Sequence, residues 1–156
     1  MQLRRPALVA SAMVLSIAPL AGCASDVDWA SEREYTQAAG ANDRDGDVDV
    51  LNALIVSAEP GKGTVYTALV NNLSDADAQL ISITAVDGAA TFELEEPIEI
   101  PARGIAKVED SGVTATGDFE AGQVVDVTFA FEGAEPVTIG VPVMPATHEF
   151  EGLDES

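Results

Sequence analysis

The chain has 156 residues and a formal net charge of −20, from 27 Asp and Glu against 7 Lys and Arg. This charge repels phosphate backbones, so nucleic acid is excluded as an expected partner. A single cysteine rules out an internal disulfide, and one Trp, two Tyr and five Phe leave a core that must consist mainly of Val, Ile, Leu and Ala.

The first 22 residues have the pattern of a secretory signal peptide. Arg4 and Arg5 form a short cationic segment, and an uncharged apolar run from Ala7 to Leu20 follows. This run of about 14 residues is shorter than the roughly 20 that a membrane-spanning helix needs. We therefore expect residues 1–22 to be removed during export.

Leu20-Ala21-Gly22-Cys23 closes this segment and resembles the bacterial lipobox, in which the cysteine thiol receives a diacylglycerol before cleavage. The resemblance implies that Cys23 begins the mature protein and carries the lipid. Several acyl chains on one residue hold a domain to a membrane far better than a single chain does. We expect a lipid-anchored protein on the extracytoplasmic face of the cell membrane; the alternative is a plain signal peptide followed by an unmodified thiol.

Residues 23–46 are predicted to be a flexible acidic spacer, because they contain no sustained apolar face. Aspartates at alternate positions between 43 and 49 are similar to a calcium-binding loop. When Gly46 is aligned with the glycine of such a loop, Ala41 and Asn52 occupy the positions of its first and last acidic ligands. A solvated acidic segment is the preferred interpretation, with weak cation binding as the alternative.

From residue 47 the apolar residues recur with a period of two, and residues 47–144 are predicted to form an all-β domain. The clearest pattern is Val125–Phe131 followed by Val137–Val143, which predicts a hairpin with one solvated face. Turn sequences separate the segments, and further strands are expected at 48–56, 64–71, 80–86, 92–94, 98–100, 105–108 and 113–116. This spacing is typical of an antiparallel Greek-key sandwich of seven to nine strands, cupredoxin- or immunoglobulin-like, with an acidic tail at 145–156.

No arrangement of residues indicates catalysis, so an enzyme is not expected. The only histidine, His148, lies in the predicted tail, and no Gly-x-Ser-x-Gly motif occurs. Gly61-Lys62-Gly63-Thr64 lacks the spacing of a phosphate-binding loop and is interpreted as a hairpin loop. Met144 and His148 are the candidate ligands for a soft metal such as Cu(I), with chance placement as the preferred interpretation.

The region from about 47 to 144 resembles the PCuAC copper-chaperone family, cupredoxin-like sandwiches that are often exported as lipoproteins. The similar segments are the strands and turns at Tyr66–Asn71, Leu80–Thr84, Ile98–Gly104, Val125–Phe131 and Val137–Val143. The resemblance implies a cupredoxin-like fold and a location at the cell surface.

The copper ligands of that family are absent from this sequence. The family binds copper through His and Met, including a His-x-Met pair after the Pro-Ala-Gly turn. The corresponding segment here, Ser111–Thr116, contains neither residue, and neither occurs between Ala85 and Glu96. The resemblance therefore points to a ligand-less branch of the kind found among actinobacterial lipoproteins.

Together these observations predict a membrane-anchored extracytoplasmic lipoprotein that acts as a non-catalytic binding or interaction module of the cell envelope. It is expected to be a monomer without a cofactor and to contact another envelope protein. The alternative is a copper-handling protein whose metal site has been altered or lost.

Overall fold

The computed structural model describes residues 39–147 and 150, and these residues form an all-β domain. The predicted fold class is confirmed. The described strands, one more than the upper estimate, are β1 (Ala41–Asp43), β2 (Val48–Glu59), β3 (Lys62–Asn71), β4 (Ala78–Ala85), β5 (Ala90–Glu93), β6 (Ile98–Ile100), β7 (Ile105–Lys107), β8 (Thr114–Gly117), β9 (Val124–Glu132) and β10 (Val137–Pro145). A short 3-10 turn, η1 (Val108–Ser111), joins β7 to β8.

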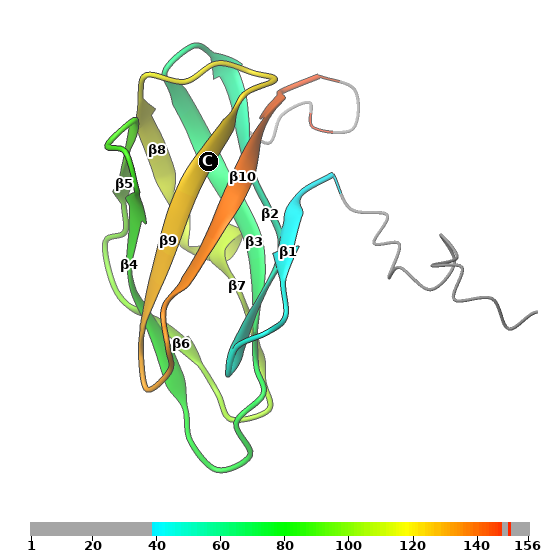
Figure 1. Cartoon of the computed structure of the whole chain (residues 1–156), viewed down its shortest axis with the longest axis vertical. Helices are drawn as coiled ribbons and strands as arrows, with labels where there is room; N and C mark the ends of the chain where they lie inside the picture. The colour runs from blue at the N-terminus through cyan, green and yellow to red at the C-terminus, as the bar shows by residue number, and fades with distance from the viewer. Residues whose placement is uncertain (1–38, 148–149, 151–156) are drawn as a thin grey trace, which may run out of the picture. The chain divides into compact units, whose positions relative to one another are not determined.

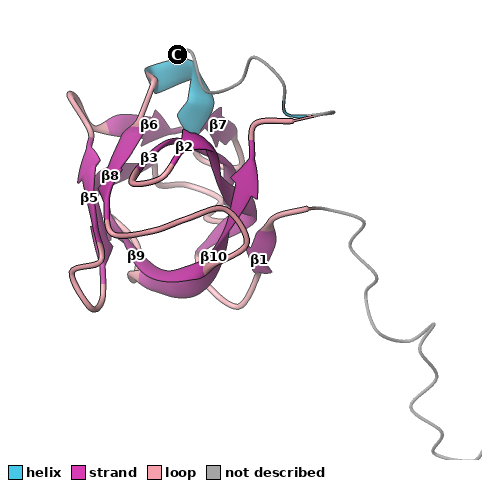
Figure 2. Cartoon of the chain, turned by 90° about the horizontal axis from the view of Figure 1, so that it is seen from above, coloured by secondary structure: helices cyan, strands magenta, loops and turns pink. Residues whose placement is uncertain are grey.

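The strands close into a barrel (Figures 1 and 2), the form that the expected sandwich takes here. Its neighbours follow the order β2-β10-β9-β4-β5-β8-β3, and β3 pairs with β2 to complete the ring. Among the described strands the pairing of β10 with β2 is parallel, whereas the prediction was for antiparallel pairs throughout. The difference arises because residues 137–142 of β10 pair with β9, and the last three residues of β10 then lie along the edge of β2.

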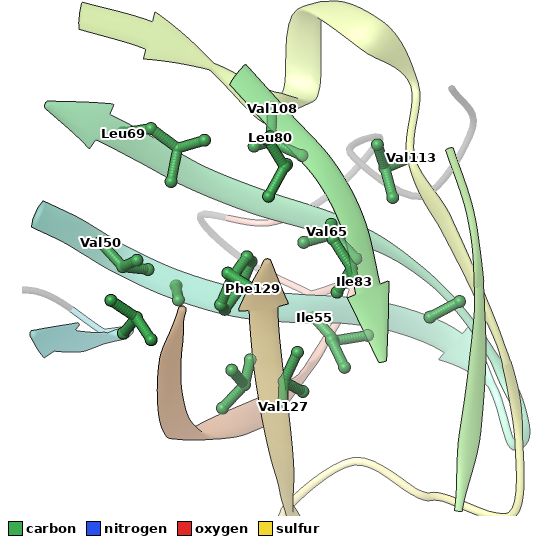
Figure 3. Close-up of a cluster of buried hydrophobic side chains, with 14 of the residues drawn as sticks. Val50, Ile55, Val65, Leu69, Leu80, Ile83, Val108, Val113, Val127 and Phe129 are labelled. Atoms are coloured by element: carbon green, nitrogen blue, oxygen red, sulfur yellow. The ribbon is translucent and has the colours of Figure 1, made fainter. Parts of the chain in front are cut away.

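The core lies inside this barrel and is made of the inward-facing residues of each strand. In β9 the predicted alternation is confirmed, since Val125, Val127, Phe129 and Phe131 are buried and the residues between them are more exposed. Figure 3 shows side chains from β2, β3, β4 and β9 meeting around Phe129, which is fully buried. Removal of these apolar side chains from water is the main stabilising contribution to the fold.

Residues 53–57 of strand β2 are buried on both faces of the strand. A bulge at Asn52, whose φ is 53°, shifts the register between Leu51 and Leu54. Beyond the bulge Ile55 points into the core, whereas Leu54 and Val56 point outward and are still at most 2% exposed. Burial on both faces explains why this part of the sequence is a continuous apolar run and does not alternate.

The structure corrects the predicted spacer at its end. Residues 41–43, assigned to the spacer, form strand β1, which pairs antiparallel with the middle of β2. The Gly40 N–H donates to Asn52 Oδ1 and the Asn52 N–H donates to Asn42 Oδ1, both at 2.9 Å. Three residues with little apolar surface carry no readable period, so the sequence pattern could not reveal this strand.

The predicted signal segment, Cys23 and His148 lie outside the described residues. Within the described part of the chain, no helix has the length and apolar character needed to cross a membrane.

Candidate binding groove

The outer surface of the barrel carries a groove where the end of β2, the beginning of β3 and β8 lie side by side. Its volume is about 430 Å³, and small residues (Ala58, Gly63 and Ala115) contribute part of its lining. The polar side chains that line it are Glu59, Lys62, Thr64, Thr114 and Thr116.

Strand register places these polar side chains together. Lys62 lies directly opposite Thr116, and Thr64 lies directly opposite Thr114, in the antiparallel pairing of β3 with β8. Ala115 is fully buried in the core, so the threonines on either side of it must point outward. The same alternation turns Thr64 outward, because the next residue of β3 belongs to the core.

Thr64 is the buried polar residue of the groove. It is 2% exposed, and its hydroxyl oxygen is not among the buried side-chain atoms that lack a hydrogen-bond partner in the described part of the chain. Thr67, which is similarly buried, donates its hydroxyl proton to the Leu51 carbonyl at 3.0 Å. Buried hydroxyls nearly always have such a partner.

Two charged side chains lie at the edge of the groove. Lys62 Nζ and Glu59 Oε2 are 3.7 Å apart, and both side chains are 73% exposed. Exposed pairs of this kind stabilise a fold by little, roughly 0–1 kcal/mol. Either group can thus reorient towards a ligand at small cost, and together they leave the groove nearly neutral.

The end of the groove is held by close backbone contacts. The Gly61 N–H donates to the Phe119 carbonyl at 2.9 Å, and the Gly117 N–H donates to the Gly61 carbonyl at 3.0 Å. Gly61 has a φ of 77°, and a Cβ there would lie 2.6 Å from the Gly117 carbonyl oxygen. These contacts fix the β2–β3 turn against β8, so the groove is preformed.

Residues 61–64 are only partly the hairpin loop that the sequence predicted. Pro60 and Gly61 form the turn, whereas Lys62 and Thr64 already belong to β3. The sequence did carry a signal for this, because Lys62 and Thr64 alternate with inward positions just as the rest of β3 does. The groove is not visible in the sequence, since its lining comes from segments at least 50 residues apart.

The groove residues do not fit copper. Thr114 and Thr116 flank Ala115 with the spacing of a His-x-Met pair and lie in the segment where the resemblance places that pair. Hydroxyl oxygens are hard ligands, whereas Cu(I) prefers thiolate, thioether or imidazole. Within residues 39–147 and 150, no group of three or more His, Cys, Asp or Glu is placed to hold a metal ion.

Met144, one of the two predicted soft ligands, lies in β10 beside Val56 of β2. Val56 in turn lies opposite Thr64, so Met144 is two strands away from the groove, about 10 Å at the usual strand spacing. The partly exposed Met144 side chain faces the same outer side as Thr64, because Val143 before it points into the core. The structure therefore does not bring Met144 into the groove.

Two aspartates of the calcium-like segment accept hydrogen bonds from other parts of the chain. Asp43 Oδ1 accepts a hydrogen bond from the Asp45 N–H at 3.3 Å, and Asp49 Oδ1 accepts one from Asn72 Nδ2 at 2.6 Å. The first contact lies within the connection between β1 and β2, and the second joins β2 to the residue that follows β3.

No protein-family model matches this chain, and comparison with curated proteins finds no match. Solved structures do match it. The chain is similar to the copper-bound PCuAC domain from PmoF2, with 20% identity, a TM-score of 0.54, and coverage of 67% of this chain and 98% of that one. It is also similar to the apo PCuAC domain from PmoF1, with 20% identity, a TM-score of 0.55, and coverage of 67% and 99%. For the apo PmoF2 PCuAC domain the identity is 17%, the TM-score 0.54, and the coverage 69% and 98%. The predicted resemblance is thus confirmed for the fold: the described domain is a PCuAC-like, cupredoxin-type β-barrel.

Proposed function

We propose that this chain is a membrane-anchored extracytoplasmic lipoprotein that acts as a non-catalytic binding module of the cell envelope. One observation carries the proposal: on a PCuAC-like barrel, hydroxyl side chains line a preformed groove in the segment where that family has a His-x-Met pair. Such a groove can bind a ligand without transferring a metal or breaking a bond.

The lipid anchor is supported by the sequence around Cys23. Its thiol would carry the diacylglycerol, and the acidic residues that follow would separate the barrel from the membrane surface. Cys23→Ala is expected to release the protein from the membrane fraction and to remove the mass of the lipid from the mature N-terminus. Membrane retention of this variant, or an unmodified Cys23 in the wild type, would contradict the anchor.

A copper-handling role is the second candidate, favoured by the fold shared with a domain described as copper-bound and by the partly exposed thioether of Met144 on β10. A Cu(I) competition titration of the full chain distinguishes the two candidates. We expect only weak, salt-sensitive binding. Sub-nanomolar binding that Met144→Ala or His148→Ala abolishes would instead establish a copper site near the C-terminus.

The envelope partner is open to a direct test with the anchored protein. Crosslinking in intact cells followed by purification compares the wild type with Thr116→Arg, which would fill the groove with a long charged side chain. A protein partner that uses the groove is expected to be lost from the variant and to remain with the wild type.

A further inference from the structure

We propose that β1 is a displaceable strand, and that the slot it occupies, beside residues 50–53 of β2 and 137–142 of β10, binds an extended Gly-x-Asn segment of another envelope protein by strand addition. The inference rests on the proposed function in one respect, because the partner is taken to be a protein of the cell envelope. It goes beyond that function by assigning a second binding surface, which shares no residue with the groove.

The slot lies along one edge of β2. Strand β3 pairs with the other edge over most of its length. On the slot side, residues 55–57 of β2 pair with the end of β10, and residues 50–53 pair with β1. Strand β1 also lies against β10 (Figure 1), and a Cβ on Gly46 would lie 3.7 Å from a side-chain carbon of Val137 at the start of β10. The slot therefore has two walls, β2 and β10.

Strand β1 pairs with only one of these walls. In the described part of the chain it pairs with β2 alone, and residues 137–142 of β10 pair with β9. The opposite edge of this part of β10 has no strand partner among the described strands. An unpaired strand edge is a template for another strand. A longer extended segment in the slot could pair with both walls and so form backbone hydrogen bonds that β1 does not form.

Few interactions hold β1 in the slot. It has three residues, each only partly buried, and none of them belongs to the apolar core. Its backbone pairing is supplemented by two hydrogen bonds, in which the Gly40 N–H donates to Asn52 Oδ1 and the Asn52 N–H donates to Asn42 Oδ1. Segments with so few buried contacts open locally without unfolding the domain. Opening of β1 would therefore expose the slot while the barrel persists.

The slot imposes a sequence requirement on its occupant. A Cβ at the position of Gly40 would lie within 3 Å of the backbone of Asn52 and Ala53, so glycine is needed there. Two residues later, Asn42 Oδ1 accepts the Asn52 N–H, and Asn42 Nδ2 donates to the Gly40 carbonyl at 3.4 Å. A carboxylate could accept the first hydrogen bond but could not donate the second. The expected partner segment therefore contains Gly-x-Asn.

The test is a titration of the full chain, ¹⁵N-labelled and in detergent, with a blocked synthetic peptide of residues 39–45. Gly40→Val in the protein is expected to keep its own β1 out of the slot, while the amides of β9 keep their chemical shifts. In this variant the peptide is expected to shift the amides of Asn52 and Ala53 saturably, with a Kd on the order of 1 mM. In the wild type β1 occupies the slot as an intramolecular competitor, so the apparent binding should be about tenfold weaker.

Altered peptides test the sequence requirement. One has Val in place of Gly40 and another has Ala in place of Asn42, and each is expected to bind about tenfold more weakly than the matched peptide. Asn42→Ala in the protein, which weakens the attachment of β1 without added bulk, repeats the titration independently of Gly40→Val and should give the same result. Absence of saturable shifts with the matched peptide up to about 10 mM, or equal binding of all three peptides, would overturn the proposal.

Two further results assign the occupant. The wild-type chain is expected to sediment as a monomer, and a dimer that Gly40→Val dissociates would show that a second copy fills the slot, which would overturn the assignment to another envelope protein. The titration depends on neither the lipid nor the groove, so its failure would overturn strand addition and leave the proposed function standing. Membrane retention of Cys23→Ala would instead contradict the proposed anchor alone.

Discussion

Asn71 joins three separate segments at the end of β3 through one buried side chain. It is 1% exposed, and its Nδ2 donates to the carbonyls of Ala76 at 2.9 Å and Ile100 at 3.0 Å. Its Oδ1 accepts a hydrogen bond from the Leu73 N–H at 2.9 Å. An asparagine thus satisfies two carbonyls and one N–H that no apolar residue of similar size could satisfy.

Replacement of Asn71 should therefore be costly. Asn71→Ala leaves these backbone groups without their partner, and each such buried group costs about 1–3 kcal/mol, so we expect a loss of about 2–4 kcal/mol in the free energy of unfolding. Urea unfolding measures this change. Asn72→Ala is the matched control, because Asn72 is exposed and its amide bonds to Asp49 at the surface, where a loss of less than about 1 kcal/mol is expected. Similar losses in the two variants would contradict this account of Asn71.

Among the elements, β1 is attached to β2 by side-chain hydrogen bonds as well as by backbone pairing. Its three residues lie beside the β2 bulge, where the amides of Asn42 and Asn52 complete the hydrogen bonding of the backbone. Gly40 fits this site because a Cβ there would lie within 3 Å of the backbone of Asn52 and Ala53. The attachment of β1 is thus local and separable from the rest of the barrel.

Asn42→Ala should detach β1 without unfolding the domain. The Asn52 N–H loses its acceptor, so its hydrogen exchange should become about tenfold faster, which corresponds to roughly 1.4 kcal/mol of lost protection. Amides of the β9–β10 pairing should keep their exchange rates. Asp43→Ala, a change in the same strand that affects only the contact with Asp45, serves as the control. Faster exchange throughout β9 and β10 would show instead that β1 is integral to the barrel.

The strands of the barrel were predictable from the sequence because period-two alternation records which side chains face the core. The pattern in Val125–Phe131 and Val137–Val143 gives both strands and their inward faces directly. The parallel β2–β10 pair and the short β1 were not predictable, because pairing between distant segments leaves no local pattern. The groove was not predictable for the same reason. Thr64 and Thr114 have the pattern of ordinary strand residues, and only the pairing of β3 with β8 places them opposite each other.

For the whole molecule, the large negative net charge opposes folding, because the compact state brings like charges closer together. The formal net charge of −20 is carried by a chain of 156 residues, and mutual repulsion favours any state that separates the charges. The core is apolar and free of charged residues among those described as buried, so the repulsion acts at the surface. Dissolved salt can therefore reduce it.

Added salt should stabilise the domain through screening. The Debye length falls from about 30 Å at 0.01 M salt to about 8 Å at 0.15 M, so most of the surface repulsion disappears over this range. We expect the Tm in NaCl to rise by about 5 °C, which for a domain of this size corresponds to roughly 1–2 kcal/mol.

Two surface substitutions show whether repulsion is the cause. Lys107→Gln on β7 removes a positive charge and should lower the Tm at 0.01 M salt, whereas Glu99→Gln on β6 removes a negative charge and should raise it. Both side chains are exposed, so packing changes little, and both differences should shrink at 0.15 M. If the two variants shifted the Tm in the same direction, or if their differences persisted at high salt, local contacts rather than net charge would determine the response. Opposite shifts that converge with salt would establish that the acidic surface is maintained at a measurable cost in stability.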